Sequence, residues 1–337
     1  NSGDGEGLEA FIGNLDALGL SDVKGTDALI AVAFSMTFAA ITPALIAGAV
    51  ADRMKFSAWV VFVPVWSLLV YTPVFYWVYY GWHHSKLDPA AIDFAGGTAI
   101  HINAGVASLA LVLVLGKRVG WPSTAMPPHN LPFVMLGVGI LWFGWFGFNG
   151  GSAFAADGVA AQAVLNTFVA GAAGMIAWLL IERIRDGHAT TLGGASGVVA
   201  GLVAITPAAG FVGGLSPIIF GALASVCCYY AIQLKTRYGY DDSLDVVGIH
   251  MVGGIVGGLL LGFFADASIG GVDGAFFGDA ALVVSQLIAI VSVIAFSFVV
   301  TFAIAKVLDN VIGIRVSDDD EVAGLDQTQH AETAYVD

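Results

Sequence analysis

The stretch ALVVSQLIAIVSVIAFSFVVTFAIA, residues 281–305, contains no Asp, Glu, Lys or Arg. About 20 consecutive apolar residues span the hydrocarbon core of a bilayer as an α-helix, so this stretch predicts a membrane-spanning helix. A strand of a membrane barrel needs about 10 residues that alternate between apolar and polar. The stretch shows no such alternation, which favours a helix over a barrel strand.

The composition of the whole chain follows the same pattern. Of its 337 residues, 58% are hydrophobic and 11% are charged, whereas soluble domains contain about 45–50% apolar and about 25% charged residues. The sequence therefore predicts an all-α polytopic membrane protein. Nine apolar segments reach or approach the length of a span: 27–51, 57–80, 97–116, 131–152, 158–181, 191–211, 216–234, 247–266 and 278–308.

The basic residues predict the orientation of the spans. Short loops rich in Lys and Arg stay on the cytoplasmic side, and ten of the twelve basic residues fall at alternate span ends. We therefore expect an extracellular loop at 1–26, a nine-helix transmembrane domain at 27–308 and a cytoplasmic tail at 309–337. Such a chain belongs in the cell (plasma or inner) membrane. The net charge of −14 argues against a nucleic-acid partner.

Two internal echoes predict an inverted repeat. The string AITPA occurs at 40–44 and again at 204–208, and His101-Ile-Asn-Ala-Gly is echoed by His250-Met-Val-Gly-Gly. In each pair the two spans run in opposite directions and lie five spans apart. Five helices per inverted repeat plus a final helix follow as the hypothesis. The first repeat would then be short by two helices, so we expect the first two helices of the fold to be absent from this chain.

Ionisable residues inside spans are costly and persist mainly for function. His101 and His250 are the candidates, and each is alternatively a buried imidazole bonded to a helix carbonyl. Asp93 and Asp245 precede them, and each is either a functional carboxylate or a helix cap. Counting from Lys117 at about 1.5 Å per residue places His101 nearer the outer face and His250 nearer the inner one, so the sequence does not show that they touch.

Aromatic residues gather toward the outer ends of several spans. Phe34, Phe38, Phe146 and Phe148 are either ordinary core or lipid-facing residues or a hydrophobic gate that dehydrates a solute. A second group is either an interfacial aromatic belt or a cation–π cup beside the Ser152 hydroxyl. That group comprises Trp77, Tyr79, Tyr80, Trp82, Trp142 and Trp145. No metal-ligand spacing, phosphate loop or nucleotide fingerprint is present, so neither a metal nor a cofactor is expected.

Several strings are specific enough to name a family. They are FSMTFAAITPALIAGAVADRMKF from 34, DFAGGTAIHINAG from 93, GWFGFNGGS from 144, GGASGVVAGLVAITPAAGF from 193, DVVGIHMVGGIVG from 245 and GLDQTQHAETAY from 324. With these strings the chain resembles the ammonium transporter family (Amt/Mep/Rh), on its bacterial-type Amt branch. The resemblance implies a homotrimer with a pore in each subunit. It also implies eleven spans per subunit, of which this chain would hold the third to the eleventh.

The resemblance also implies roles for individual residues. Phe38 and Phe148 would form the stacked gate, and His101 and His250 the twin histidines of the pore. Phe34, Ser152 and Asp93 would belong to the outer recruitment site. The family's recruitment Trp follows a Y-x-P-x-x-H-x-x pattern. Aligned from Tyr71, this chain has Tyr76 in place of that His and Tyr79 in place of that Trp, so either Tyr79 or Trp82 completes the site.

The function expected from these residues is transport of ammonium or ammonia, with no enzymatic activity. Ammonium would be recruited at the outer aromatic site and deprotonated, and ammonia would pass along the histidines. An ammonium sensor and a nonconducting truncated fragment are the alternatives. The tail suggests a PII-type regulatory protein as a partner at the inner face, and contact between the acidic tail and basic inner loops is the simpler interpretation.

Overall fold

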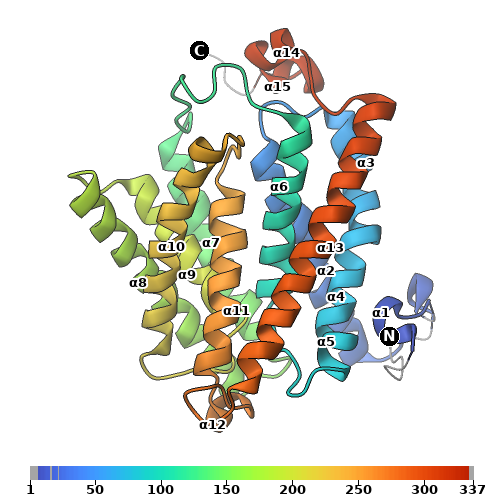
Figure 1. Ribbon diagram of the computed structural model, residues 1–337, viewed down its shortest axis with the longest axis vertical. Coiled ribbons are helices and arrows are strands. Elements are labelled where there is room, and N and C mark those ends of the chain that lie inside the picture. The colour runs from blue at the N-terminus through green and yellow to red at the C-terminus, as the bar shows by residue number, and fades with distance from the viewer. Residues whose placement is uncertain (1–6, 16, 22, 334–337) are drawn as a thin grey trace.

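The protein is a bundle of long helices in the computed structural model, which describes residues 7–15, 17–21 and 23–333 (Figure 1). Three segments, η2, η3 and η4, are π-helical, and η1 is a single 3₁₀ turn. The predicted outer loop is described only in part, because residues 1–6, 16 and 22 lie outside these ranges. The elements are α1 Glu9–Ile12, η1 Leu18–Leu20, α2 Thr26–Val50, α3 Phe56–Trp66, η2 Ser67–Tyr71, α4 Thr72–Tyr79, α5 Trp82–Ser85, η3 Gly97–Ile102, α6 Asn103–Leu115, α7 Leu131–Gly151, α8 Gly158–Arg185, α9 Thr191–Ile205, α10 Ser216–Tyr238, η4 Val247–Met251, α11 Val252–Phe264, α12 Ala267–Gly270, α13 Ala281–Ile312, α14 Asp318–Ala323 and α15 Leu325–His330.

Eight helices of the described chain are long and apolar enough to cross a membrane. They coincide with eight of the nine predicted segments. The sixth predicted segment, 191–211, is helical only over the 15 residues of α9. The chain leaves the helix just before Pro207, which has no N–H to continue the hydrogen-bond pattern. The Pro207 carbonyl instead accepts a hydrogen bond from the Phe94 amide at 3.0 Å.

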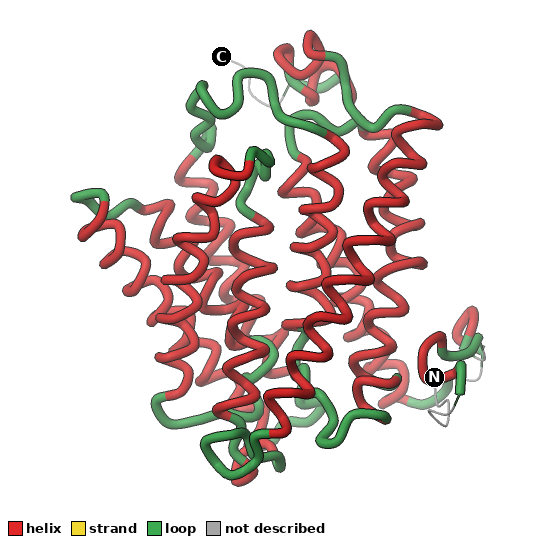
Figure 2. The backbone as a smooth tube through the Cα atoms, viewed as in Figure 1, coloured by secondary structure: helices red, strands yellow, loops and turns green. Residues whose placement is uncertain are grey.

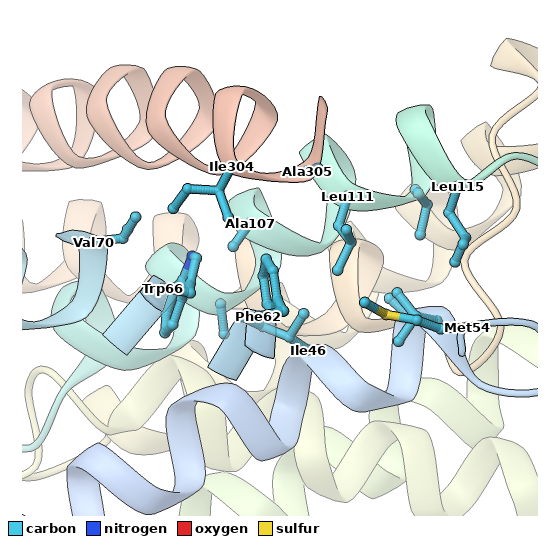
Figure 3. Close-up of a cluster of buried hydrophobic side chains, with 14 of the residues drawn as sticks. Ile46, Met54, Phe62, Trp66, Val70, Ala107, Leu111, Leu115, Ile304 and Ala305 are labelled. Atoms are coloured by element: carbon cyan, nitrogen blue, oxygen red, sulfur yellow. The ribbon is translucent and has the colours of Figure 1, made fainter. Parts of the chain in front are cut away.

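The helices pack around α6, the most enclosed span. In the span formed by η3 and α6, Gly97–Leu115, 83% of the most apolar 18 residues are buried, against 6% in α7. Figure 3 shows the largest apolar cluster, in which Phe62 and Trp66 of α3 face Leu111 of α6 and Ile304 of α13. Lipid tails are as apolar as these side chains, so helices in a bilayer associate through close van der Waals packing. This cluster supplies such packing between helices far apart in sequence.

The bundle has two ends that differ in what they carry. We call the end where α14 and α15 lie the tail face (top of Figure 1) and the end with α5 and α12 the opposite face. The loops gather at these two ends, with the long helices running between them (Figure 2). The N-terminal α1 lies beside α4 and α5, where Tyr76 donates a hydrogen bond to the Glu9 carbonyl at 2.8 Å.

Candidate functional site

The two histidines meet at the centre of the bundle. Their Nδ1 atoms are 3.1 Å apart, and the ring centroids are 5.2 Å apart with planes inclined by 11°. His101 is 3% exposed and His250 is 9% exposed. The distance count from Lys117 left open whether they touch, and the structure shows that they do.

Each histidine lies in a π-helical segment at the start of a span. His101 lies in η3 and His250 in η4. π-Helical turns are rare and are frequent at functional sites. Each widened segment continues into a regular helix, α6 or α11, so the two spans enter the bundle from opposite ends and bring their histidines together.

Two glycines explain the close approach of these segments. Gly105 and Gly254 each lie four residues after a histidine. A Cβ at Gly105 would lie 2.5 Å from the Met251 amide nitrogen, and one at Gly254 would lie 2.8 Å from the Gly97 carbonyl oxygen. Each glycine therefore lets the backbone of the opposite π-helical segment approach, which is the physical meaning of the HINAG and HMVGG echo.

One proton can be shared between the two Nδ1 atoms, because a neutral imidazole carries one N–H and one acceptor. The Nε2 atom of His101 is buried and has no hydrogen-bond partner. The histidine pair therefore offers a buried imidazole nitrogen that is not bonded to another protein group. Within the described residues, no three His, Cys, Asp or Glu side chains converge in a group that could hold a metal ion.

The Trp145 side chain stacks on the His101 ring. The indole lies parallel to the imidazole, with centroids 5.3 Å apart and planes inclined by 10°. Trp145 Nε1 donates a hydrogen bond to Thr206 Oγ1 at 2.9 Å. The interpretation of Trp145 as part of an outer belt or cup is therefore wrong, because the side chain is 6% exposed and packs on His101. Trp142, one turn earlier, stacks on Phe168 instead.

Two phenyl rings, one from α2 and one from α7, stack on each other. Phe38 and Phe148 have centroids 4.4 Å apart and planes inclined by 24°. Phe34 meets Phe38 edge-on at 5.3 Å and lies 6.2 Å from Phe148. The rings of Phe34, Phe38 and Phe148 thus form one contiguous group, which we call the phenyl stack. Phe146 is not part of it and packs on Phe168.

Tyr79 lies beside the phenyl stack, as do Phe75 and Phe154. Its ring lies 6.4 Å from that of Phe38, and its hydroxyl is buried without a hydrogen-bond partner. Trp82 contacts Phe11, Trp77 and His83 instead. Ser152 Oγ donates to the Phe148 carbonyl at 2.9 Å, which leaves the hydroxyl oxygen able to accept. Of the two candidates, the structure brings Tyr79 to Phe38.

Asp93 is fixed by four backbone amides at the start of η3. One oxygen accepts from Gly96 and Gly97 at 2.9 and 2.6 Å, and the other from Thr98 and Ala99 at 2.8 and 2.9 Å. Both interpretations of Asp93 remain compatible with this geometry, because the carboxylate caps the segment that carries His101. Burial raises the pKa of Asp93, and the four amide bonds oppose that rise.

The capping interpretation of Asp245 is wrong. Its carboxylate pairs with Lys235 Nζ at 2.6 Å. The cap of η4 is Asp242, whose Oδ2 accepts from the Val247 amide at 2.7 Å. Asp242 precedes His250 by eight residues, as Asp93 precedes His101, so the spacing was the signal that could have found it.

Ion pairs connect the loops and the tail at the tail face. Arg118 makes a bidentate pair with Asp241, with Nε–Oδ2 and NH2–Oδ1 distances of 2.9 and 2.8 Å. Arg315 pairs with Glu321 of α14 at 2.7 Å, and Glu321 also accepts from the Val119 amide at 2.7 Å. Glu321 of the acidic tail thus contacts the loop after α6 through the Val119 amide, whereas its basic partner, Arg315, belongs to the tail itself.

A comparison with known proteins decides the family. Residues 2–335 match the model of the Ammonium Transporter Family. The chain belongs to the ammonium transporter family. An ammonium transporter of Mycobacterium tuberculosis strain H37Rv is 51% identical over 325 residues, which cover 91% of this chain and 68% of that protein. This relative is named as a transporter, and the family assignment places this chain with transporters rather than enzymes.

Solved structures of the family share the fold. The structure of Candida albicans Mep2 is similar with a TM-score of 0.86 and 35% identity, over 93% of this chain and 73% of that one. A structure described as a Sensor Amt Protein is similar with a TM-score of 0.87 and 25% identity, over 96% and 83% of the two chains. The all-helical fold predicted from the apolar segments is thus confirmed.

Proposed function

We propose that this chain moves ammonium or ammonia across the membrane through a pore that contains the phenyl stack and the histidine pair. The observation that carries the proposal is the pair itself: two imidazoles 3.1 Å apart, both at least nine-tenths buried, in a family of ammonium transporters. A dry path lined by neutral hydrogen-bonding groups suits a small uncharged solute that can donate and accept hydrogen bonds.

Recruitment begins on the opposite face in this proposal. Phe34 and Tyr79 supply aromatic faces, which attract a cation by about 0.5–2 kcal/mol each, and the Ser152 hydroxyl supplies an acceptor. Asp93 adds a fixed negative charge near the start of η3, held by its four amides. Tyrosine binds a cation less strongly than tryptophan does, so Tyr79 makes this a weaker cup than one built on Trp.

Selectivity then follows from the cost of dehydration. Phe38 and Phe148 stack closely enough to exclude a hydrated ion, and an isolated cation stripped of water in an apolar interior is very costly. Ammonium can leave its proton behind and continue as ammonia, whereas potassium cannot. The Nε2 atom of His101 offers ammonia a hydrogen-bond partner behind the phenyl stack.

The assembly and orientation belong to the same proposal. We place the tail face in the cytoplasm, where basic loops are retained, and a PII-type regulatory protein is a candidate partner for that face. Only 6% of the most apolar 18 residues of α7 are buried, and the helix exposes Phe133, Ile140 and Phe143. This apolar exposed face supports a homotrimer contact along α7.

Transport is tested in liposomes on a solid-supported membrane. We expect an ammonium pulse to give a transient current, a potassium pulse to give none, and His101→Ala to abolish the ammonium current. His129→Ala, on the loop before α7, is the matched control and keeps it. If the current is absent, an internal pH dye separates electroneutral ammonia conduction, which alkalinises the lumen, from a protein that binds without transporting. Equal signals from wild type and His101→Ala would refute the pore.

A further inference from the structure

The two aspartates that cap the π-helical segments are placed alike but bonded differently. Asp93 and Asp242 each precede a histidine of the pair by eight residues. Both oxygens of Asp93 accept two amide hydrogen bonds each. Asp242 Oδ2 accepts from Val247 at 2.7 Å, but its Oδ1 is buried with no hydrogen-bond partner, and the residue is 1% exposed.

A buried carboxylate oxygen without a partner is costly as an anion. Leaving one buried acceptor unsatisfied costs more than an ordinary hydrogen bond contributes, and the cost is larger for a charged group. Binding a proton at Oδ1 removes the charge and with it most of this cost. The geometry therefore lets a proton compete for Asp242 near neutral pH, whereas the four amides of Asp93 favour its anion.

The charged groups around Asp242 act in the same sense. Burial, and then the like charge of Asp245, raise the pKa of Asp242 to about 6, against the smaller opposing effects of amide hydrogen bonds and Lys235. Lys235 Nζ lies 2.6 Å from Asp245 and donates to the Asp242 backbone carbonyl at 3.1 Å, so its charge is largely taken by Asp245. The other titratable or charged groups of this region are Tyr240, which follows α10, Asp241, which is paired with Arg118 after α6, and Arg53 after α2.

We propose that Asp242 is a proton-binding carboxyl that positions His250, so that the proton concentration at the tail face sets the rate of the pore. The proposal rests on the proposed transport function. The step is a simple protonation: the carboxylate takes a proton from solvent at the tail face and becomes a neutral carboxylic acid.

The link to His250 is the cap on η4. An ionised cap makes charge-assisted hydrogen bonds that are about twice as strong as neutral ones and complements the positive end of the helix dipole. Protonation weakens this cap, loosens the first turn of η4 and moves His250 away from His101. We expect transport to be high above pH 6 at the tail face and to fall below it.

The first test varies the pH at the tail face alone. Vesicles are captured in one orientation through a tag on the tail, and the ammonium current is recorded with the tail-face buffer between pH 5 and 8. We expect the wild-type current to fall about threefold to tenfold from pH 7 to pH 5, in keeping with loss of a charge-assisted cap. Asp242→Asn, a permanently neutral cap, has the low current at every pH. Asp245→Asn removes the like charge and moves the midpoint to lower pH.

A second readout does not depend on transport. Infrared difference spectra between pH 5 and 8 contain a protonated-carboxyl band that is lost in Asp242→Asn and kept in Asp266→Asn, a change at an exposed cap on the opposite face. If no variant carries current, the proposed function fails, and this band still decides whether Asp242 binds a proton. A missing band, or an unchanged pH dependence of the current in Asp242→Asn, would overturn the proposal.

Discussion

The contact between Gly254 of α11 and Gly97 of η3 is a place where a single methyl group has a calculable effect. A Cβ at Gly254 would lie 2.8 Å from the Gly97 carbonyl oxygen and 2.8 Å from Ile102 Cγ1. Ordinary contacts at a Cβ begin near 3.4 Å, so the segments must separate by about 0.6 Å. If that shift is carried to the histidines, the Nδ1–Nδ1 distance grows from 3.1 Å to about 3.7 Å, beyond hydrogen-bonding range.

Gly254→Ala is therefore expected to break the contact between His101 and His250. A neutral hydrogen bond contributes about 0.5–1.5 kcal/mol, and about 1.4 kcal/mol in a barrier corresponds to a tenfold change in rate. We expect the ammonium current to fall up to about tenfold. Overpacking should also destabilise the protein by about 1–3 kcal/mol.

The matched control is Gly258→Ala, one turn further along α11. There the Cβ would meet Ile290 Cδ1 at 3.0 Å, which is the flexible end of a side chain that can move. Current is measured on a solid-supported membrane, and thermal unfolding of both variants is followed in detergent. A folded Gly254→Ala protein that carries the wild-type current would refute the argument that close packing at this glycine sets the histidine distance.

Three further predictions concern other contacts. Asp241→Asn removes the buried anion that pairs with Arg118 and should lower the free energy of unfolding by about 3–5 kcal/mol. Asp52→Asn, at the exposed end of the same network, should lower it by less than about 1 kcal/mol. Trp145→Leu removes the ring stacked on His101 and should reduce the ammonium current several-fold, while Trp142→Leu should not, so equal losses would contradict the stacking role. Glu321→Gln should release α14 and speed proteolytic cleavage of the tail, with an unchanged cleavage rate counting against its anchoring by Arg315 and Val119.

The sequence predicted the fold because a bilayer restricts the choices. Apolar length and basic-loop alternation depend on local composition, and both pointed to spans at the right places. The exception, 191–211, shows where local rules end. The same string AITPA stays inside α2 at Pro43 and follows the end of α9 at Pro207. Pro207 has tertiary contacts with Phe94 and Gly97, which a local rule does not include.

The resemblance implied that Phe38 and Phe148 stack, but the sequence did not show that His101 and His250 touch. Phe38, Phe148, His101 and His250 were identified by motif, yet their contacts depend on helices that cross at Gly105 and Gly254. Distance counted along a regular helix left open whether the histidines touch, because it takes no account of how the two helices cross. The π-helical starts of η3 and η4 change that geometry, and the sequence carries no simple signal for a π-helical turn.

The repeat explains both the site and its asymmetry. Inverted repeats bring two equivalent segments to one point, so a His, a capping Asp and a Gly occur on each side of the pair. Equivalent positions need not have equivalent chemistry, because each lies at a different end of the bundle. Asp93 has four amide donors, whereas Asp242 keeps one bare oxygen beside Asp245. In the proposed pore, Asp93 would hold a charge at the face where a cation enters and Asp242 would titrate at the other face, and this difference would distinguish the two ends of a symmetric arrangement.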